Sequence, residues 1–227
     1  MEERNKYIMK KQFAVLGLGR FGGSLVEEFA NLDVDVLAID RNQEVVNKFS
    51  NSATYVVQAN AIDEASLKGL GIRNVDHALI SFGDDIEASV LATMLLKDMG
   101  VKQVWVKAVN MYHQKVLEKI GADKVIHPER DIAKRIAHHV VSEKIIDYIE
   151  LSKDYSIVEI VASKKLHNKT LFDLNIRAKY GCNIIGFQRK DGEMVISPTA
   201  HEIIEQGDML IVIGHNRDLN RFEEEGV

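Results

Sequence analysis

The sequence predicts an α/β protein in which a doubly wound parallel sheet is followed by a small α+β domain. Over residues 12–127, short runs rich in β-branched and apolar residues alternate with amphipathic stretches, which is typical of repeated βαβ units. After residue 151 the alternation gives way to several short β-like runs around one helical stretch. With 227 residues, of which 46% are hydrophobic, the chain can bury two cores.

Six strands are expected in the first domain, which we place at residues 11–128. Each strand is a short apolar run, and the helices between the runs close with a glycine or a polar turn. The strands are expected at residues 12–17, 35–40, 54–59, 77–82, 103–109 and 124–127, and helices at residues 21–31, 86–99 and 112–120. Joined by right-handed crossovers, six such strands make a doubly wound parallel sheet.

A long amphipathic stretch comes next, and we expect it to form a linking helix over residues 129–151. Five regularly spaced residues are available for its apolar face: Ile132, Ile136, Val140, Ile145 and Ile149. A helix of this length between two differently patterned regions predicts a connection between two domains.

The second domain is expected at residues 152–227. Its β-like runs, at residues 156–161, 184–188, 194–197 and 209–213, surround one helix at residues 171–180, which is typical of a small α+β domain. At the other end of the chain, residues 1–10 are expected to form a polar tail, with Met9 as an alternative start.

Composition and charge narrow the classes of function. Lys and Arg number 29 against 34 Asp and Glu, and a net charge of −5 argues against a general nucleic-acid binder, which carries a basic surface. The longest apolar stretches, such as residues 90–96, are far shorter than the ~20 residues of a membrane-spanning helix. Cys182 is the single cysteine, so an internal disulfide framework is excluded, and no secretory leader is visible. We therefore expect a soluble protein of the reducing cytosol.

A glycine-rich turn is the strongest functional signal. Gly17, Gly19 and Gly22 form G-x-G-x-x-G after an expected strand and at the start of an expected helix. In a Rossmann-like fold the first glycine permits a tight turn, the second lets a phosphate approach the backbone, and the third lets the helix pack on the strand. Asp40 ends the second expected strand, where a carboxylate accepts hydrogen bonds from ribose hydroxyls. Together these residues predict an adenine-nucleotide site, with an empty Rossmann-like fold as the alternative.

Two charged residues, one inside this turn and one at the start of the linking helix, have two interpretations each. Arg20 lies inside the turn, where its guanidinium can reach a terminal phosphate and so indicates ATP or ADP; the alternative is a solvated arginine at a helix start. Glu129 begins the linking helix, where it can ligate a magnesium or calcium ion together with nucleotide phosphates, or serve the helix dipole alone.

Signals for catalysis are weak. A dehydrogenase needs an acid or base beside the nicotinamide, and residues 152–227 leave little room for a substrate domain. The eight histidines are scattered; His113, His138 and His139 lie on expected helices outside any metal-binding pattern. Cys182 has no neighbouring histidine, so buried packing is expected there instead of nucleophilic chemistry. The sequence therefore predicts a binding protein and not an enzyme.

Four motifs together resemble a known family. They are residues 13–24 (FAVLGLGRFGGS), 119–123 (KIGAD), 127–131 (HPERD) and 176–181 (IRAKYG). In this order they resemble the KtrA/KtrC-type regulatory subunits of bacterial Ktr potassium uptake systems, in the Trk/Ktr family, whose domains are called RCK domains. The resemblance extends over nearly the whole chain.

The resemblance implies an N-terminal RCK domain, a crossover helix that interlocks dimers, and a C-terminal RCK subdomain. It implies that homodimers assemble into a homo-octameric gating ring in the cytoplasm. This ring would lie at the inner face of the membrane, bound to a potassium-translocating subunit of the KtrB or KtrD type, with no membrane insertion of its own.

The resemblance also implies an ATP or ADP site in the first domain. The residues that would meet the phosphates, the ribose or the rest of the nucleotide are Gly17, Gly19, Arg20, Phe21, Gly22, Asp40, Arg41, Asn60, Ala61, Ser81, Phe82 and Lys107. Arg20 would reach the γ-phosphate across the dimer, and Glu129 would hold a divalent cation near the phosphates. The family often has aspartate at the position of Asn60, so a charge-dependent contact is lost there.

In the second domain the resemblance implies cyclic di-AMP, held between two subunits and inhibiting potassium uptake. Arg177 and Asn183 match positions that contact the phosphates, and Ile176 and Ile184 would flank the adenines. From the residues alone, Arg177 and Asn183 are explained equally well as a solvated cation and a turn residue.

The function expected from all these features is that of a regulator that gates a potassium transporter in response to ATP or ADP and to cyclic di-AMP. Two alternatives stay open because the glycine-rich turn and Asp40 also suit a dinucleotide: a small NAD(H)-dependent oxidoreductase and a non-catalytic NAD(H) redox sensor.

Overall fold

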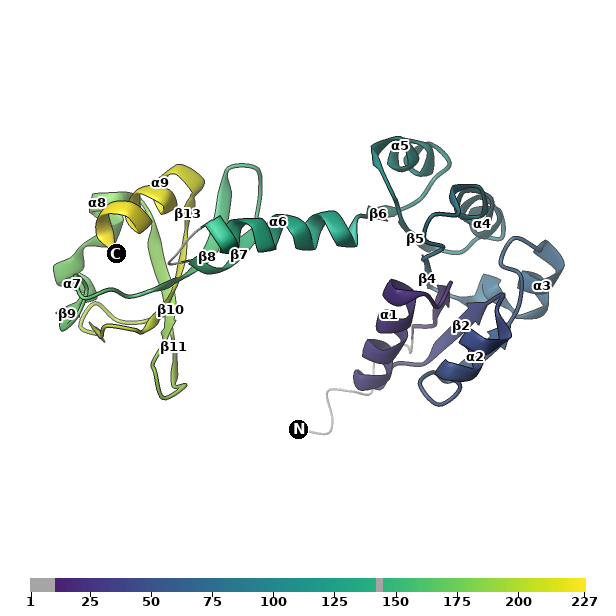
Figure 1. Ribbon diagram of the computed structural model, residues 1–227, viewed down its shortest axis with the longest axis horizontal. Helices are drawn as coiled ribbons and strands as arrows, with labels where there is room; N and C mark the ends of the chain where they lie inside the picture. Colours follow the sequence, from purple (N-terminus) through teal and green to yellow (C-terminus); the bar gives the residue numbers. More distant parts are fainter. Residues whose placement is uncertain (1–10, 142–144) are drawn as a thin grey trace. The chain divides into compact units, whose positions relative to one another are not determined.

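The computed structural model describes residues 11–141 and 145–227. The chain divides between Pro128 and Glu129 into two compact units (Figure 1). The expected N-terminal tail, residues 1–10, lies outside the described residues.

A six-stranded parallel sheet forms the centre of the first unit. Its strands are β1 (Phe13–Leu16), β2 (Val36–Asp40), β3 (Tyr55–Gln58), β4 (His77–Ile80), β5 (Gln103–Lys107) and β6 (Lys124–Ile126). Their order across the sheet is β3-β2-β1-β4-β5-β6, and β1 pairs with both β2 and β4 in parallel. The expectation of six strands in a doubly wound, Rossmann-like sheet is confirmed, and the order reverses between β1 and β4.

Five α-helices and a 3₁₀ turn connect these strands. They are α1 (Arg20–Asn31), α2 (Gln43–Phe49), α3 (Glu64–Gly69), η2 (Ile72–Asn74), α4 (Ile86–Asp98) and α5 (Met111–Lys119). Four of the α-helices begin after a side chain that accepts a hydrogen bond from a first-turn amide: Asn42, Asp63, Asp85 and Asn110. Such caps fix where each helix starts, directly after the carboxyl end of a strand or its loop.

The helices cover the two faces of the sheet separately. Successive residues of a strand point to opposite faces, so Val15 and Leu16 of β1 belong to two different cores. The core around Val15 includes residues of α1 and α2, and the core around Leu16 includes residues of α3, α4 and α5 (Figure 1). Both cores leave the carboxyl edge of the sheet accessible to a ligand.

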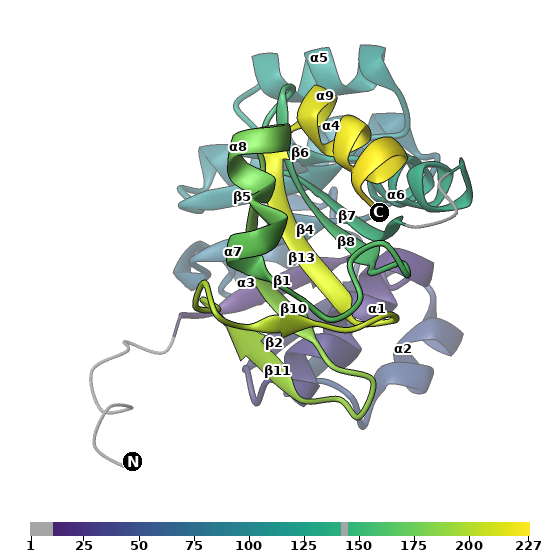
Figure 2. The same cartoon turned by 90° about the vertical axis from the view of Figure 1, so that its left-hand side faces the viewer.

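An antiparallel five-stranded sheet dominates the second unit. Its strands, in the order β11-β10-β13-β8-β7, are Met194–Ile196, Asn183–Gln188, Met209–His215, Tyr155–Val161 and Ile145–Glu150. A two-stranded ribbon joins β9 (Lys169–Thr170) and β12 (Ile203–Ile204), and the helical segments are α6 (Pro128–Val141), α7 (Leu171–Leu174), α8 (Ile176–Tyr180), α9 (Asn216–Arg221) and a π-helical turn (Phe222–Gly226). Figure 2 shows α8 and α9 beside β10 and β13, where Phe187, Leu210 and Phe222 are fully buried.

The expectation of a linking helix over residues 129–151 is wrong, because the helix in the structure is shorter. Helix α6 ends at Val141, and Ile145–Glu150 form strand β7, which pairs with β8. Ile145 and Ile149 fit the apolar face of a helix, but a spacing of four residues also places two side chains on one face of a strand. The run is rich in β-branched and aromatic residues, and cross-strand pairing with β8 decides the outcome.

The single helix expected at residues 171–180 is also wrong, because it is broken at Asn175. This residue adopts the left-handed conformation, with φ 44° and ψ 44°, and separates α7 from α8. Asparagine tolerates that conformation better than most residues, so the break is local in origin. Helix α9 was not expected.

Candidate functional site

A cavity of about 590 Å³ lies at the carboxyl edge of the parallel sheet. Its walls come from the residues that follow β1, β2, β3 and β4 and from the start of α4: Gly17, Gly19, Ile39, Asp40, Arg41, Ala59, Asn60, Ala61, Ile62, Ser81, Phe82, Gly83, Asp85, Glu87 and Ala88. The cavity therefore includes the point between β1 and β4 where the strand order reverses, which is where ligands bind in sheets of this kind.

The three glycines of the turn differ in what surrounds them. Gly17 has a φ of +92°, and a Cβ there would lie 2.5 Å from the carbonyl oxygen of Ser81. At Gly22 a Cβ would overlap the carbonyl oxygen of Gly17, so this position must be glycine for α1 to pack on the turn. A Cβ at Gly19 would have no atom within 4 Å. Gly17 and Gly22 thus shape the turn, and Gly19 leaves open space for a ligand to approach the backbone.

Helix α1 begins at this open space. Gly19 is its N-cap and supplies no side-chain hydrogen bond, and the first turn contains no acidic residue. Amides of the first turn of a helix have no partner inside the helix and attract anions. The start of α1 is therefore suited to a phosphate group.

Asp40 ties the glycine-rich turn to the end of β2. Its Oδ2 accepts a hydrogen bond of 2.7 Å from the amide of Leu18, and its Oδ1 accepts one of 2.9 Å from the amide of Asn42. Each carboxylate oxygen has a further lone pair. Asp40 can therefore hold the turn and accept a hydrogen bond from a ribose hydroxyl at the same time.

Charged and polar groups of the second and third loops form the rest of the cavity wall. The guanidinium of Arg41 lies 3.5 Å from the carboxylate of Asp85, which also caps α4 through the amide of Ala88. The side-chain Oδ1 of Asn60 accepts a 3.3 Å hydrogen bond from the backbone amide of Ile62. An uncharged amide thus stands at the position where the family often has aspartate.

Eight of the residues predicted to bind a nucleotide line this cavity: Gly17, Gly19, Asp40, Arg41, Asn60, Ala61, Ser81 and Phe82. Five others do not: Arg20, Phe21, Gly22, Lys107 and Glu129. Arg20 and Phe21 lie in the first turn of α1 and Gly22 packs beneath the glycine-rich turn, while Lys107 ends β5.

Arg20 is exposed at the first position of α1, and within residues 11–141 and 145–227 its side chain makes no ion pair. Glu129 belongs to the second unit, in the first turn of α6. Over the same described ranges, no group of three or more His, Cys, Asp or Glu side chains is placed to hold a metal ion.

Sequence reasoning missed Asp85, Glu87 and Ile62 as cavity residues. A signal was present, because Ile62 and Asp85 lie in loops that follow expected strands and Glu87 lies in the first turn of the next expected helix, and the carboxyl ends of parallel strands share one edge. Only the strand order decides that the loop after β4 lies beside the turn after β1.

A second cavity, of about 560 Å³, lies in the second unit. It brings together all four residues predicted to contact cyclic di-AMP: Ile176, Arg177, Asn183 and Ile184. Six further residues line it: Leu171, Phe172, Asp173, Asn175, Lys179 and Cys182. The break between α7 and α8 and the start of β10 form its wall, so Arg177 and Lys179 provide cationic groups beside an exposed aromatic ring, Phe172.

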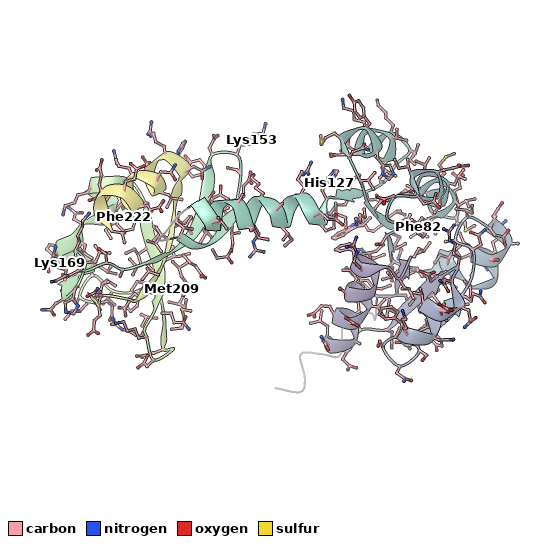
Figure 3. All side chains as sticks on the ribbon, in the orientation of Figure 1. Phe82, His127, Lys153, Lys169, Met209 and Phe222 are labelled. Atoms are coloured by element: carbon pink, nitrogen blue, oxygen red, sulfur yellow. The ribbon has the colours of Figure 1, made fainter. Side chains whose placement is uncertain are left out.

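The remaining candidate reactive groups are packed in the interior. Burial raises the pKa of the Cys182 thiol to about 11, so the thiol stays protonated at neutral pH. His113 is 2% exposed, and its Nδ1 accepts a 3.4 Å hydrogen bond from the amide of Val109. Burial, followed by the charge of His127, lowers the pKa of His113. His127 is labelled in Figure 3, and its Nε2 lies 2.7 Å from the Gln114 side-chain oxygen. The side chains of His138 and His139 lie outside those described.

Among the helices of the described residues, none is both long enough and apolar enough to cross a membrane.

Two domain families match the chain. Residues 13–128 match the TrkA-N domain and residues 155–225 match the TrkA-C domain. These matches cover the parallel-sheet unit and most of the antiparallel-sheet unit.

Curated relatives cover nearly the whole chain. The chain is 51% identical over 216 residues to the Ktr system potassium uptake protein C of Bacillus subtilis (strain 168), which covers 95% of this chain and 97% of that protein. It is 49% identical over 220 residues to the Ktr system potassium uptake protein A of the same organism, with 97% and 99% covered. Among solved structures, the GsuK RCK domain resembles it with a TM-score of 0.53 and 20% identity, over 96% of this chain and 46% of that chain, which supports the fold.

Proposed function

The chain belongs to the Ktr family of potassium uptake regulators, with a TrkA-N and a TrkA-C domain, and on that premise we propose that it gates a membrane potassium transporter by binding ATP or ADP in the first unit and cyclic di-AMP in the second. We also propose that it acts without catalysing a reaction. Gating then follows from a difference in ligand affinity between two conformations of the assembly, and no bond is broken.

The observation that carries this proposal is the cavity at the carboxyl edge of the parallel sheet. It combines an open approach to Gly19, unpaired first-turn amides of α1 and the carboxylate of Asp40. The open space at Gly19 and the amides of α1 suit a phosphate chain, and the carboxylate of Asp40 suits a ribose. An adenine would then lie toward the loop of Asn60 and Ala61, beyond the ribose.

Arg20 supports ATP and ADP as ligands over NAD(H). Its side chain is exposed at the first position of α1 and forms no ion pair with residues 11–141 or 145–227. An arginine has five N–H donors and binds phosphate oxygens in pairs. We propose that it contacts the γ-phosphate of an ATP bound by a second copy of the chain. Only ATP has this phosphate, so Arg20 would distinguish ATP from ADP.

A divalent cation, Mg²⁺ or Ca²⁺, fits this proposal only if it bridges the carboxylate of Glu129 and the phosphates of the nucleotide. Glu129 offers one carboxylate, and the described residues provide no cluster of three metal ligands. Magnesium commonly takes one or two carboxylates, with phosphates and water completing its shell. We propose that Glu129 supplies one oxygen to a cation whose other ligands are phosphate oxygens and water, which would neutralise charge on ATP.

The second cavity supports the proposal for cyclic di-AMP. Arg177 can pair with a phosphate, Asn183 can donate to one, and Ile176 and Ile184 provide apolar surface for an adenine. Cyclic di-AMP carries two identical halves. A two-fold pair of subunits presents the same cavity twice, so one ligand can be shared between two copies.

The surface of α6 supports a homodimer. Ile132, Ile136 and Val140 are 50%, 55% and 74% exposed and lie four residues apart, so they form one apolar stripe. Exposed apolar side chains also occur on α4 and α5 of the first unit: Ile86, Leu91, Met94, Met111 and Val116. Exposed apolar residues on both units allow dimers to associate further. We propose that they close into a homo-octameric ring in the cytoplasm, bound to the membrane subunit.

Titration calorimetry of the purified chain tests the proposal. ATP, ADP, NADH and cyclic di-AMP are titrated separately, with and without magnesium. We expect ATP and ADP to bind with different affinities and cyclic di-AMP to bind independently of both. Tight binding of NADH without binding of ATP would replace the proposal with that of an NAD(H) redox sensor or oxidoreductase.

A further inference from the structure

Helix α6 and the edge strand β7 are held together by ion pairs. Arg135 donates through Nη2 to both carboxylate oxygens of Asp147, at 3.0 Å each. Lys134 pairs with Glu150 one residue earlier on the helix. Both bridges join α6 to β7, so they bring together two elements of the second unit.

A polar cavity of about 770 Å³ lies between these two elements. Six of its lining residues are charged: Arg130, Asp131, Lys134, Arg135, Glu150 and Lys153. Figure 3 labels Lys153 at the turn that follows β7. The apolar side chains in the lining, Ile149 and Leu151, are 54% and 52% exposed. The space between α6 and β7 is therefore open to water and is not a packed core.

The apolar stripe of α6 lies opposite Lys134 and borders Arg135 on the helix surface. At 100° per residue, Lys134 projects about half a turn from Ile132 and Ile136, whereas Arg135 projects about 60° from Ile132 and about 100° from Ile136. All described side chains from residue 129 to residue 137 are exposed. Burial of the side chains from residue 129 to residue 137 therefore contributes little to holding the helix on β7, and over this part of α6 the two ion pairs take a correspondingly larger share.

Ion pairs in this setting are sensitive to salt. The side chains of Lys134 and Glu150 are 50% and 35% exposed, and those of Arg135 and Asp147 are 52% and 37% exposed. The Debye length falls from roughly 14 Å at 0.05 M to roughly 4 Å at 0.5 M monovalent salt, so exposed charges at contact distance attract one another less. A packed apolar joint would not weaken in this way.

We propose that the contact between α6 and β7 is a clamp that opens as the concentration of potassium salts rises. At low ionic strength the Arg135–Asp147 and Lys134–Glu150 bridges keep α6 on the sheet, and at high ionic strength α6 detaches. The clamp itself stands on this geometry alone. Its use as a signal of accumulated potassium rests on the proposed function, because a regulator of uptake would then respond to the ions that uptake delivers.

Hydrogen exchange measured by mass spectrometry on the full chain tests the clamp. Loss of the two ion pairs lowers the free energy of opening α6 by their contribution, whether or not its apolar stripe contacts a second copy of the chain, so the amides of this helix of 14 residues exchange faster. We expect peptides of α6 to exchange about 2- to 30-fold faster in 500 mM than in 50 mM KCl, as two exposed ion pairs allow. Peptides of α5 serve as the internal reference, and light scattering at both salts reports any change of assembly.

Two variants make the result specific. Asp147→Asn combined with Glu150→Gln removes both negative charges at nearly constant volume, and α6 should then exchange fast already in 50 mM KCl, with no further response to salt. Glu64→Gln breaks the exposed Lys68–Glu64 pair inside α3 and should leave the response of α6 unchanged.

Three outcomes would overturn the clamp: equal protection of α6 at both salt concentrations in the unmodified chain, a salt response that survives in the double variant, or opening by millimolar pyrophosphate at constant ionic strength. The last would mean that the cavity binds anions and that screening is not the cause. No nucleotide is present in these measurements. Failure of the clamp is therefore distinct from failure of the proposed ligand sites.

Discussion

Glycine positions at the start of α1 illustrate how single residues separate folding from binding. Gly19 and Gly22 belong to the same turn, yet a Cβ at Gly19 meets open space and a Cβ at Gly22 meets the carbonyl oxygen of Gly17. The first residue is therefore expected to matter for the ligand and the second for the structure. Asp40 contributes to both the structure and the ligand site, since its carboxylate accepts a hydrogen bond from Leu18 of the turn and lines the cavity.

Gly22→Ala should consequently reduce the stability of the fold, and Gly19→Ala should reduce nucleotide binding. Alanine favours a helix over glycine by about 0.5–1 kcal/mol, but the overlap at Gly22 is expected to cost more, about 1–3 kcal/mol or above. Gly22→Ala should therefore lower the melting temperature. Gly19→Ala should keep the melting temperature and weaken ATP and ADP binding at least tenfold, because a methyl group fills the space beside the phosphates. Thermal unfolding and calorimetry measure both, and a stable Gly22→Ala protein would contradict this assignment.

Arg20→Ala should narrow the difference between ATP and ADP affinity. The proposed contact with a γ-phosphate exists only for ATP, and a contribution within the usual allosteric range of about 1–3 kcal/mol corresponds to about 5- to 150-fold in affinity. Arg73→Ala is the matched control, because Arg73 is also exposed in the first unit and does not line the cavity. If Arg20→Ala discriminates between ATP and ADP as well as the unmodified chain does, Arg20 has no such role.

His113 should make the first unit less stable in mild acid. Burial lowers the pKa of His113 below its ordinary 6.5, with a smaller contribution from the charge of His127. The unfolded chain then binds more protons than the folded chain as the pH falls below about 6.5, so the stability present above that pH is progressively lost. Melting temperatures at pH 7.5 and 5.5 should differ less in His113→Gln than in the unmodified chain. If the melting temperature falls equally between pH 7.5 and pH 5.5 in His113→Gln and in the unmodified chain, groups other than His113 cause the loss of stability.

Among the elements, helix α6 has two kinds of surface residue: Lys134 and Arg135 form ion pairs with β7, and a stripe of apolar residues is exposed. The face with Lys134 and Arg135 meets β7 through ion pairs, and the face with Ile132, Ile136 and Val140 is exposed. An exposed apolar stripe on one helix is far better explained by a partner than by solvent. The same helix is thus available for association between copies while remaining joined to its own unit.

Ile136→Glu should dissociate the proposed dimer. A carboxylate in the centre of an apolar interface is buried without a partner, which costs several kcal/mol. Light scattering or sedimentation should then report a smaller assembly. Leu32→Glu places the same charge on another exposed apolar residue, 63% exposed and outside α6, and should leave the mass unchanged. An unchanged mass in Ile136→Glu would place the dimer contact elsewhere.

At the scale of the whole molecule, each unit has a cavity of its own. Gly17, Asp40 and Ser81 line the first, and Arg177 and Asn183 line the second. The units have separate cores, and the division falls between Pro128 and Glu129. The two proposed ligands would therefore bind to different domains of the chain.

Variants of the two cavities should affect their ligands separately. Arg177→Ala with Asn183→Ala removes two groups that would bind phosphate, each charged or polar contact contributing about 1–3 kcal/mol, so cyclic di-AMP affinity should fall at least 30-fold. ATP affinity in the same protein should stay within about twofold of the unmodified value. Calorimetry with both ligands measures this. Loss of ATP binding in the double variant would show that the two sites are not separate.

The sequence predicted those parts of the fold whose signals are local. The six strands of the first unit were predicted because each is a short run of β-branched residues bounded by turn residues, and helices α1, α4 and α5 have clear ends. It misjudged the region from Glu129 to Ile149, because Ile145 and Ile149 fit the period of a helix and of a strand equally well. The break at Asn175 was missed because a single residue of left-handed conformation leaves no periodic signal.

What the sequence determined by itself was the glycine-rich turn, Asp40 at the end of a strand, and the likeness to potassium uptake regulators, since each depends on residue types at fixed spacing. Only the tertiary structure decided that Asp85 and Glu87 share a cavity with Gly17, that Arg177 and Asn183 lie in one hollow, and that α6 meets β7 through charged side chains. The physical reason is that strand order and cross-strand pairing bring together residues far apart in the chain, and hydrophobic burial selects that pairing for the unit as a whole.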